Sequence, residues 1–275
     1  MKKAIAYFPE IIFRHLRIWT LKELSVLQKV IFMFQIPISW FRLFFLRKKS
    51  VNYFGHQLAF ERFVDPITLL TYPQEVSTIL AQLKDVGNIH TVLDIGGNIG
   101  QFSITMVNMA KVSSIDVFEP NSEIYKLLER NTRNYPHIKL FNFGIGKKGS
   151  RTFYFEENKS STGSIVKSNA NNDQTALKEI KINLVDNVYK ITKRRQYDLI
   201  KIDVEGSEYE VIAHLKGVKT KYLYMEISAN REKSFYSSEI FELITRNFGK
   251  FEVLWQDEVD NEAICYNILL YFLSI

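Results

Sequence analysis

The chain has 275 residues, 46% of them hydrophobic and 24% charged, which is enough to bury the core of one large domain together with an additional segment. A single cysteine, Cys265, excludes an internal disulfide bond, and no group of Cys and His residues has the spacing of a zinc site. Cys265 lies in the apolar stretch 263–273, where we expect it to be a small packed side chain.

The net charge of +6 is unevenly distributed along the chain. Residues 1–50 contain ten Lys and Arg against two Asp and Glu, a balance of +8, whereas residues 51–275 contain 26 against 28, a balance of −2. Enzymes that act on nucleic acid usually carry a basic patch around the catalytic domain. The distribution therefore predicts that neither DNA nor RNA is the substrate.

Residues 1–50 form a basic, apolar segment that we expect to be mostly helical. An uncharged stretch over 30–41 is followed by Arg42, by four apolar residues and by the basic run 47–49. A transmembrane helix needs about 20 apolar residues, so the stretch is too short to span a membrane. It also starts late for a signal peptide, and no small-residue cleavage site follows it.

Two interpretations of this segment are favoured, and a true membrane span is the third. The first is an apolar helix, kinked at Pro37, that packs on the rest of the chain or on a second subunit. The second is a segment that lies in a membrane interface, where anionic lipid attracts each basic residue by about 1 kcal/mol.

The remainder, residues 51–275, is predicted to be one α/β domain. After a stretch of strand or loop over 51–72, apolar residues at helical spacing predict a helix over 74–84. Strands are predicted at 91–94, 114–118, 138–143, 197–203, 221–226, 250–255 and 263–272, and helices at 99–110, 121–133, 207–215 and 237–247. This alternation predicts a mostly parallel sheet covered by helices, closed by an antiparallel pair of strands.

Residues 150–185 interrupt the alternation. Strands predicted at 151–156 and 180–185 flank a Ser-rich loop over 159–168. Loops near strand ends often determine specificity, so this inserted hairpin can cover the substrate side of a crevice. A surface loop without function is the alternative.

A glycine-rich turn follows the first core strand. Residues 92–100 are V-L-D-I-G-G-N-I-G, in which the strand ends at Asp94 and Gly96, Gly97 and Gly100 allow a tight turn before the next helix. Glycine also lets a ligand approach the main chain closely. The segment therefore predicts a nucleotide-cofactor site.

The spacing of the glycines and the position of Asp94 indicate which cofactor. A dinucleotide fingerprint starting at Gly96 requires glycine at positions 98 and 101, which are occupied by Asn98 and Gln101. The Asp94 carboxylate would repel a pyrophosphate and attract a cation. S-adenosylmethionine, with a sulfonium, an α-ammonium and no phosphate, fits this charge better than NAD.

Three further acidic residues end predicted strands. Glu119 follows the strand 115–118, where a carboxylate is placed to accept hydrogen bonds from ribose hydroxyls, although a solvated strand end is the alternative. Asp203 ends the strand before Gly206, and Glu226 ends the strand 222–225. Because ligands of open α/β sheets bind outside the carboxyl ends of the strands, Asp94, Glu119, Asp203 and Glu226 should converge there.

Together these motifs resemble the FkbM-type S-adenosylmethionine-dependent methyltransferases. The matching segments are V-L-D-I-G-G-N-I-G-Q-F-S at 92–103, V-F-E-P-N at 117–121, L-V-D-N-V at 184–188, I-K-I-D-V-E-G-S-E at 200–208 and Y-M-E-I at 224–227. The resemblance covers about residues 85–230. It implies a Rossmann-like class I methyltransferase fold with a seven-stranded sheet, and methylation of a hydroxyl oxygen, often on a sugar or polyketide-like acceptor.

The resemblance also implies roles for individual residues. It places Asp94, Gly96 and Gly100 at the methionine side of the cofactor, with Gly97 and Asn98 in the same turn. Glu119 corresponds to the ribose ligand and Asn142 to an adenine-side contact. Asp203 corresponds to the residue beside the sulfonium and the acceptor, and Glu205 and Glu208 belong to the same D-x-E-G-x-E signature.

A neutral hydroxyl is a poor nucleophile, so a general base would accelerate methyl transfer by about 100- to 10,000-fold. Asp203 is the first candidate for that base, with Glu205 and Glu226 behind it. These carboxylates can instead hold a divalent cation, but no spacing demands one and no metal site is predicted. Stabilisation of a helix N-terminus is the alternative role for Glu205 and Glu208.

The sequence thus favours a cytoplasmic S-adenosylmethionine-dependent O-methyltransferase that acts on a glycan or glycolipid-like hydroxyl at the inner membrane face, attached through residues 1–50. Two alternatives remain. One is a non-catalytic membrane-associated protein that binds the cofactor, and the other is an NAD-dependent oxidoreductase on the same sheet.

Overall fold

The computed structural model describes residues 18–46, 49–60, 71–83, 89–156, 177–228, 236–257 and 265–273. Their main feature is a seven-stranded sheet in the order β11-β12-β10-β9-β3-β4-β5. The strands are β3 (Thr91–Ile95), β4 (Ser114–Phe118), β5 (Ile138–Phe141), β9 (Gln196–Ile202), β10 (Lys219–Ser228), β11 (Phe251–Gln256) and β12 (Cys265–Phe272). Neighbouring strands from β10 to β5 run parallel, while β12 is antiparallel to both β10 and β11. The predicted α/β fold and its closing antiparallel pair are confirmed.

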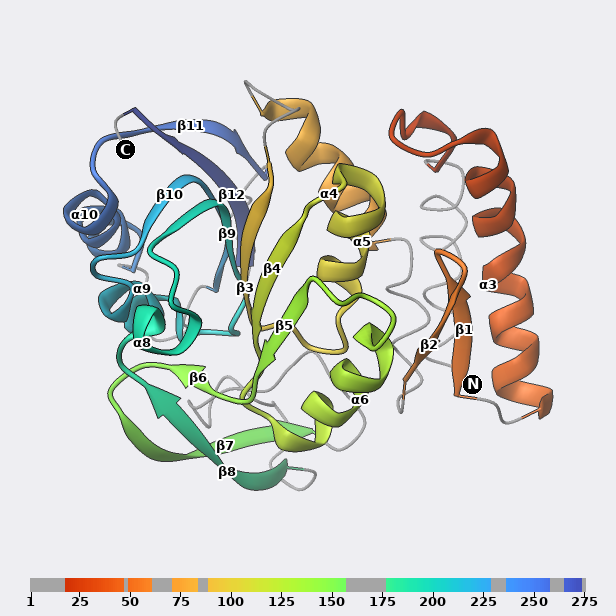
Figure 1. Ribbon diagram of the computed structural model, residues 1–275, viewed down its shortest axis with the longest axis horizontal. Helices are drawn as coiled ribbons and strands as arrows, with labels where there is room; N and C mark the ends of the chain where they lie inside the picture. Colours follow the sequence, from red (N-terminus) through yellow and green to blue (C-terminus); the bar gives the residue numbers. More distant parts are fainter. Residues whose placement is uncertain are drawn as a thin grey trace.

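Helices cover both faces of this sheet (Figure 1). One face packs against α4 (Thr71–Gln82), α5 (Gln101–Ala110) and α6 (Ser122–Thr132), and the other against α8 (Val188–Thr192), α9 (Glu208–His214) and α10 (Tyr236–Phe248). The central strands are apolar on both sides because both faces are buried: Val92 and Leu93 of β3 are 0% exposed. The sheet is therefore held between two apolar cores, one on each face.

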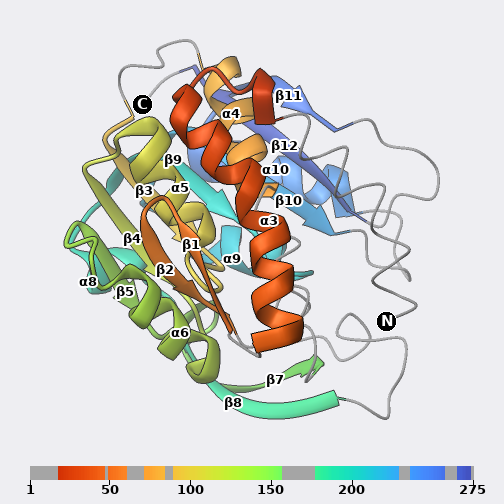
Figure 2. The same cartoon turned by 90° about the vertical axis from the view of Figure 1, so that its right-hand side faces the viewer.

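Residues before α4 add an outer layer on the side of α5 and α6 (Figure 2). The layer contains a 3-10 turn, η1 (Ile18–Thr20), the long helix α3 (Val26–Leu46) and a hairpin of β1 (Ser50–Tyr53) and β2 (His56–Ala59). Phe32 of α3 contacts Tyr53 and Phe54 edge-on, with ring centroids 5.9 and 5.2 Å apart. The Tyr53 hydroxyl shares a 2.6 Å hydrogen bond with Thr105 of α5.

The described part of the basic N-terminal segment therefore packs on the domain through one face, as the first of the two interpretations requires. Asn131 of α6 anchors the hairpin further, since its side chain hydrogen-bonds both the N–H and the carbonyl oxygen of Ala59. Among the described residues we find no helix with the length and apolarity needed to cross a bilayer.

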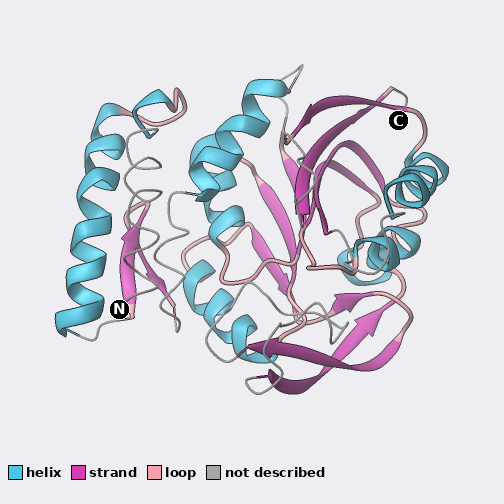
Figure 3. Ribbon diagram, turned by 180° about the vertical axis from the view of Figure 1, so that it is seen from behind, coloured by secondary structure: helices cyan, strands magenta, loops and turns pink. Residues whose placement is uncertain are grey.

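The inserted segment forms a second, three-stranded sheet (Figure 3). Its order is β6-β8-β7, with β6 (Gly144–Ile145), β7 (Gly149–Glu156) and β8 (Leu177–Val185). The predicted strands at 151–156 and 180–185 are thus present as parts of β7 and β8. The predicted Ser-rich loop 159–168 lies outside the described residues.

The expectation that Cys265 is packed is wrong. Cys265 is the first residue of β12 and is exposed, because the strand projects beyond the apolar core at this end. Its thiol lies within hydrogen-bonding reach of the Glu226 carboxylate on the neighbouring strand, and burial and Glu226 raise the pKa of that thiol to about 12. A thiol with so high a pKa stays protonated and is a weak nucleophile.

Candidate active site

A cavity of about 110 Å³ opens at the carboxyl ends of β3, β4 and β9. Its polar wall contains Gly96, Asn98, Glu119, Asn121, Asp203, Glu205 and Ser207. Its apolar wall includes Ile95, Phe118, Phe143, Phe153, Ile182, Leu184 and Val204. Because Phe153, Ile182 and Leu184 come from β7 and β8, the inserted sheet forms one side of the cavity.

The glycine turn after β3 is fixed between β4 and β9. The N–H groups of Gly96 and Gly97 both donate to the carbonyl oxygen of Phe118, at 2.9 and 3.0 Å. Gly96 has φ +85°, and a Cβ there would lie 1.8 Å from the carbonyl oxygen of Asp203. A Cβ on Gly97 would lie 2.1 Å from Val117 Cγ1. The turn therefore requires glycine for both conformation and space.

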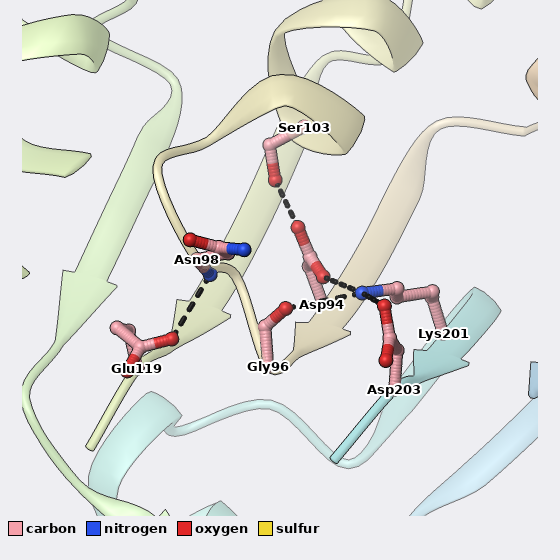
Figure 4. A network of polar contacts seen from close by, with 7 residues as sticks. All are labelled: Asp94, Gly96, Asn98, Ser103, Glu119, Lys201 and Asp203. Atoms are coloured by element: carbon pink, nitrogen blue, oxygen red, sulfur yellow. Dashed lines mark hydrogen bonds and ion pairs between the residues drawn. The ribbon is translucent and has the colours of Figure 1, made fainter. Parts of the chain in front are cut away.

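Asp94 lies beneath this turn and does not line the cavity. Its side chain is fully buried, its Oδ2 accepts a 2.6 Å hydrogen bond from Ser103, and its Oδ1 lies 3.6 Å from the ammonium nitrogen of Lys201. The same ammonium donates to the Gly96 carbonyl oxygen at 3.0 Å and pairs with Asp203 Oδ2 at 3.1 Å (Figure 4). Asp94 thus stabilises the turn indirectly, because it pairs with the Lys201 ammonium that donates to the Gly96 carbonyl oxygen.

Lys201 is a buried residue beside the site that the sequence analysis missed. Burial lowers the pKa of its ammonium, but Asp203 and Asp94 outweigh that effect and hold the pKa above its usual value, so Lys201 is charged. A cation in the middle of the apolar strand L-I-K-I was the available signal, since a buried lysine requires a partner.

The register of the sheet explains why Lys201 lies beside Asp94. Asp94 on β3, Lys201 on β9 and Tyr224 on β10 are directly opposite one another in the parallel ladders. Their side chains therefore project from the same face of the sheet. Lys201 also lies over the ring of Phe102 of α5, 5.6 Å from its centroid.

Glu119 is held at the cavity wall by two backbone groups. Its carboxylate accepts hydrogen bonds from the N–H of Asn98 at 2.9 Å and of Asn121 at 2.8 Å. Burial raises the pKa of Glu119 to about 7, although these hydrogen bonds oppose the shift. Asn142 does not line the cavity; its amide donates to the carbonyl oxygens of Glu119 and Pro120 and so braces the loop that presents Glu119.

Asn98 has a left-handed backbone, with φ +47°, and lines the cavity. Its side-chain oxygen is buried without a hydrogen-bond partner in the structure. A buried acceptor without a partner costs free energy, so this oxygen is available to a ligand donor.

Three predicted acidic residues converge beside the glycine turn: Asp203 and Glu205 line the cavity, and Glu226, which does not line it, lies next to them. Carboxylate oxygens of Asp203, Glu205 and Glu226 lie within 4.8 Å of one another. Burial and the neighbouring carboxylates raise the pKa of Glu205 to about 9 and that of Glu226 to about 7. Glu205 also has a strained backbone, with φ +52°. Fully ionised, the three side chains would carry more negative charge than Lys201 neutralises, and the raised pKa values of Glu205 and Glu226 reflect that repulsion.

Glu208 has a local structural contact instead. Its carboxylate accepts a 2.8 Å hydrogen bond from the N–H of Gly206, in the turn that begins α9. His56 lies away from the cavity, where its ring contacts Asn134 and Tyr135.

Helix α4 contributes two further residues that the sequence analysis did not single out. Tyr72 lines the cavity, and Glu75 hydrogen-bonds Tyr224. Burial raises the pKa of Glu75 to about 8, while Lys201 opposes that shift. The available signal was a carboxylate at position 75, one residue before the buried Val76 and on the same side of the helix as Tyr72 and Ile79.

Comparison with known proteins gives a family match. Residues 94–251 match the family model described as the methyltransferase FkbM domain. Among curated proteins, the antimetabolite synthetase AmbE of Pseudomonas aeruginosa is 25% identical over 179 residues, covering 51% of this chain and 8% of that protein. Methyltransferase 1 of Beauveria bassiana is 25% identical over 146 residues, covering 45% of this chain and 57% of that protein. The chain thus spans less than two thirds of either relative.

A solved structure shows the same fold, and a second one has a lower similarity. A transferase candidate from Pyrococcus horikoshii superposes with a TM-score of 0.51 at 12% identity, covering 88% of this chain and 84% of that one. A methyltransferase FkbM from Methylobacillus flagellatus has a TM-score of 0.43 at 14% identity, covering 77% and 56%.

Proposed function

Since the chain belongs to the methyltransferase FkbM domain family, we propose that it transfers a methyl group from S-adenosylmethionine to a hydroxyl oxygen of a sugar, glycan or glycolipid-like acceptor. The observation that supports this most directly is the cavity, whose wall contains the glycine turn and, next to it, Asp203 and Glu205 of the acidic cluster. S-adenosylmethionine supplies an activated methyl group, and the protein must align the acceptor and exclude water.

The residues of the cavity fit this cofactor. Glu119 offers an acceptor for ribose hydroxyls, and the unpaired side-chain oxygen of Asn98 lies in the same wall. Phe118 and Phe143 provide an apolar surface for a base. The carboxylates around Asp203 favour a cation, so a sulfonium and an ammonium group would lower their mutual repulsion.

We assign the proton transfer to the acidic cluster. Lys201 fixes one oxygen of Asp203, which leaves the other oxygen to accept the proton of the acceptor hydroxyl as that hydroxyl attacks the methyl carbon. Glu226, with a pKa of about 7, lies next to Asp203 and can receive the proton from it, whereas Glu205, with a pKa of about 9, can do so only at a pH where it is ionised. A divalent cation on the three carboxylates is the alternative, which addition of a chelator tests directly.

Calorimetry with S-adenosylmethionine and NADH in parallel tests the cofactor. S-adenosylmethionine should bind and NADH should not, because the first glycine turn departs from the dinucleotide pattern. Asp203→Asn should keep cofactor binding and lose turnover; a variant that still turns over removes Asp203 from the chemistry.

Mass spectrometry of glycans and lipids from cells with and without the protein tests the acceptor. The expected difference is one methyl group on a hydroxyl of a sugar or glycolipid. Cofactor binding without any methylated product in these extracts would favour the non-catalytic alternative. If the acceptor is a glycolipid, the enzyme must reach the membrane surface, and the +8 balance of residues 1–50 supports attachment at the inner face.

A further inference from the structure

Helix α3 carries a row of exposed apolar side chains on its outward face. The side chains of Leu27, Ile31, Phe34, Ile38 and Phe41 are 68%, 41%, 64%, 51% and 55% exposed. Their spacing of four, three, four and three residues places them in one stripe along the helix. Phe32, on the opposite side, is only 2% exposed and packs on the β1–β2 hairpin. We call the five exposed residues the outer stripe.

The outer stripe is the main concentration of exposed apolar side chains in the described residues. Of the eleven large hydrophobic residues that are exposed there, seven lie between Trp19 and Phe41. At 1.5 Å per residue, the stripe runs for about 21 Å along the outermost helix of the molecule (Figures 1 and 2). An apolar surface of this extent on a monomer usually marks an interaction site.

The charges beside the stripe indicate what covers it. Helix α3 contains no acidic residue, and Lys22 and Lys49 near its two ends are exposed. Glu23, one of the two acidic residues in 1–50, accepts a 2.6 Å hydrogen bond from Ser77 and so is directed toward α4. Two copies of this face would bring like charges together, whereas an anionic surface would complement them.

We propose that the outer stripe of α3 lies flat in the interface of an anionic lipid bilayer, with its apolar side chains among the headgroups and acyl chains and the exposed Lys22 and Lys49 toward the lipid phosphates. This inference deepens the proposed function by naming the surface through which the enzyme reaches a glycolipid-like acceptor. It rests on that function only for the acceptor, because lipid binding does not require turnover.

Vesicle flotation of the full chain tests the proposal. The protein should float with vesicles of phosphatidylcholine and phosphatidylglycerol and remain behind with phosphatidylcholine alone. The double variant Phe34→Glu and Ile38→Glu should bind at least about tenfold more weakly, since two apolar side chains no longer enter the interface. Replacing a single exposed lysine, Lys49→Gln, should weaken binding about fivefold.

A matched control carries the same two charges elsewhere. Val253→Glu and Leu273→Glu change residues that are 51% and 52% exposed, in β11 at one edge of the sheet and directly after β12, and this variant should float like the unchanged protein. Calorimetric binding of S-adenosylmethionine by both variants shows that each is folded.

Three results would overturn the proposal. The first is an unchanged protein that does not float with anionic vesicles, and the second is a stripe variant that floats as well as the control. The third is light scattering that shows a dimer which only the stripe variant dissociates, without lipid binding, because a second copy would then cover α3. Loss of cofactor binding in the unchanged protein would instead contradict the proposed function and leave the lipid result intact.

Discussion

The outer face of α3 and the carboxyl edge of the sheet depart from ordinary burial in opposite directions. The α3 stripe exposes apolar side chains to water, while the sheet edge buries Asp94 and Lys201 and crowds Asp203, Glu205 and Glu226 together. Each departure costs stability in the isolated chain, and under the two proposals each would be relieved by a different ligand: a lipid surface in one case and a cationic cofactor in the other. Local departures of this kind mark functional sites more specifically than the regular fold around them.

The largest effect should follow removal of the buried cation. Lys201→Met leaves Asp94 buried without its counter-charge and the Gly96 carbonyl oxygen without its donor, so the free energy of unfolding should fall by about 3 to 5 kcal/mol. Urea titration at neutral pH measures the loss. Lys181→Met, at an exposed lysine on β8, is the control. A loss below about 1 kcal/mol would show that the pair does not stabilise the turn.

Substitutions on the two faces of α3 should differ in their effect on the free energy of unfolding. Phe32→Ala removes a buried ring that contacts Tyr53 and Phe54, and should lower the free energy of unfolding by about 3 kcal/mol. Phe34→Ala, on the outer stripe, should change it by less than about 0.5 kcal/mol. Thermal or urea unfolding measures both. Equal effects would mean that the stripe is packed in solution.

A pair of glycine variants distinguishes the steric effect of a Cβ in the glycine turn from the effect of backbone strain alone. Gly96 and Gly217 have nearly the same φ, +85° and +86°, but a Cβ at Gly217 meets nothing within 4 Å. Gly96→Ala should weaken S-adenosylmethionine binding by about 100-fold, because its Cβ displaces the main chain of Asp203. Gly217→Ala should cost only backbone strain, about 1 to 2 kcal/mol of stability, with unchanged affinity. Comparable affinities for the two variants would show that the turn does not contact the cofactor.

The smallest effect concerns pH. The folded-state pKa of Glu205, about 9, lies above its ordinary value of 4.5, so its contribution to stability is present at low pH and is lost as the pH rises toward 9. Glu205→Gln should therefore raise the Tm at pH 8 to 9 by about 2 to 4 °C and leave it nearly unchanged near pH 4. Calorimetric scans at both pH values measure this. S-adenosylmethionine should stabilise the unchanged protein more than the variant at high pH, and the reverse order would contradict a cationic ligand beside Glu205.

Much of the fold could be predicted from local sequence patterns. Apolar runs that end in Gly or in an acidic residue predicted the strands of the main sheet, and their alternation with helices predicted that they are parallel. The position of Glu119 in the cavity wall also agrees with the prediction, because the carboxyl ends of parallel strands meet at one edge. Helix α5 begins at Gln101, two residues later than predicted, because Gly100 has φ +93° and is outside the helix.

Contacts between distant residues were not predictable in this way. The pairing of Asp94 with Lys201 joins residues more than 100 positions apart and depends on the register of β3 against β9. Glu75 reaches Tyr224 only because α4 packs on the face of the sheet from which Tyr224 projects. The prediction that Asp94 presents its charge to the cofactor rested on its place in the motif; in the structure, Lys201 lies beside that charge.

By itself, the sequence determined which segments become strands, where the chain must turn on glycine, and that its basic charge gathers in residues 1–50, because these follow from the periodicity and conformational freedom of neighbouring residues. Only the tertiary structure decided which charges are paired, which acids share the cavity, and which face of α3 is left in contact with water. Those properties depend on packing between elements, and burial and electrostatic energies are set by neighbours in space rather than along the chain.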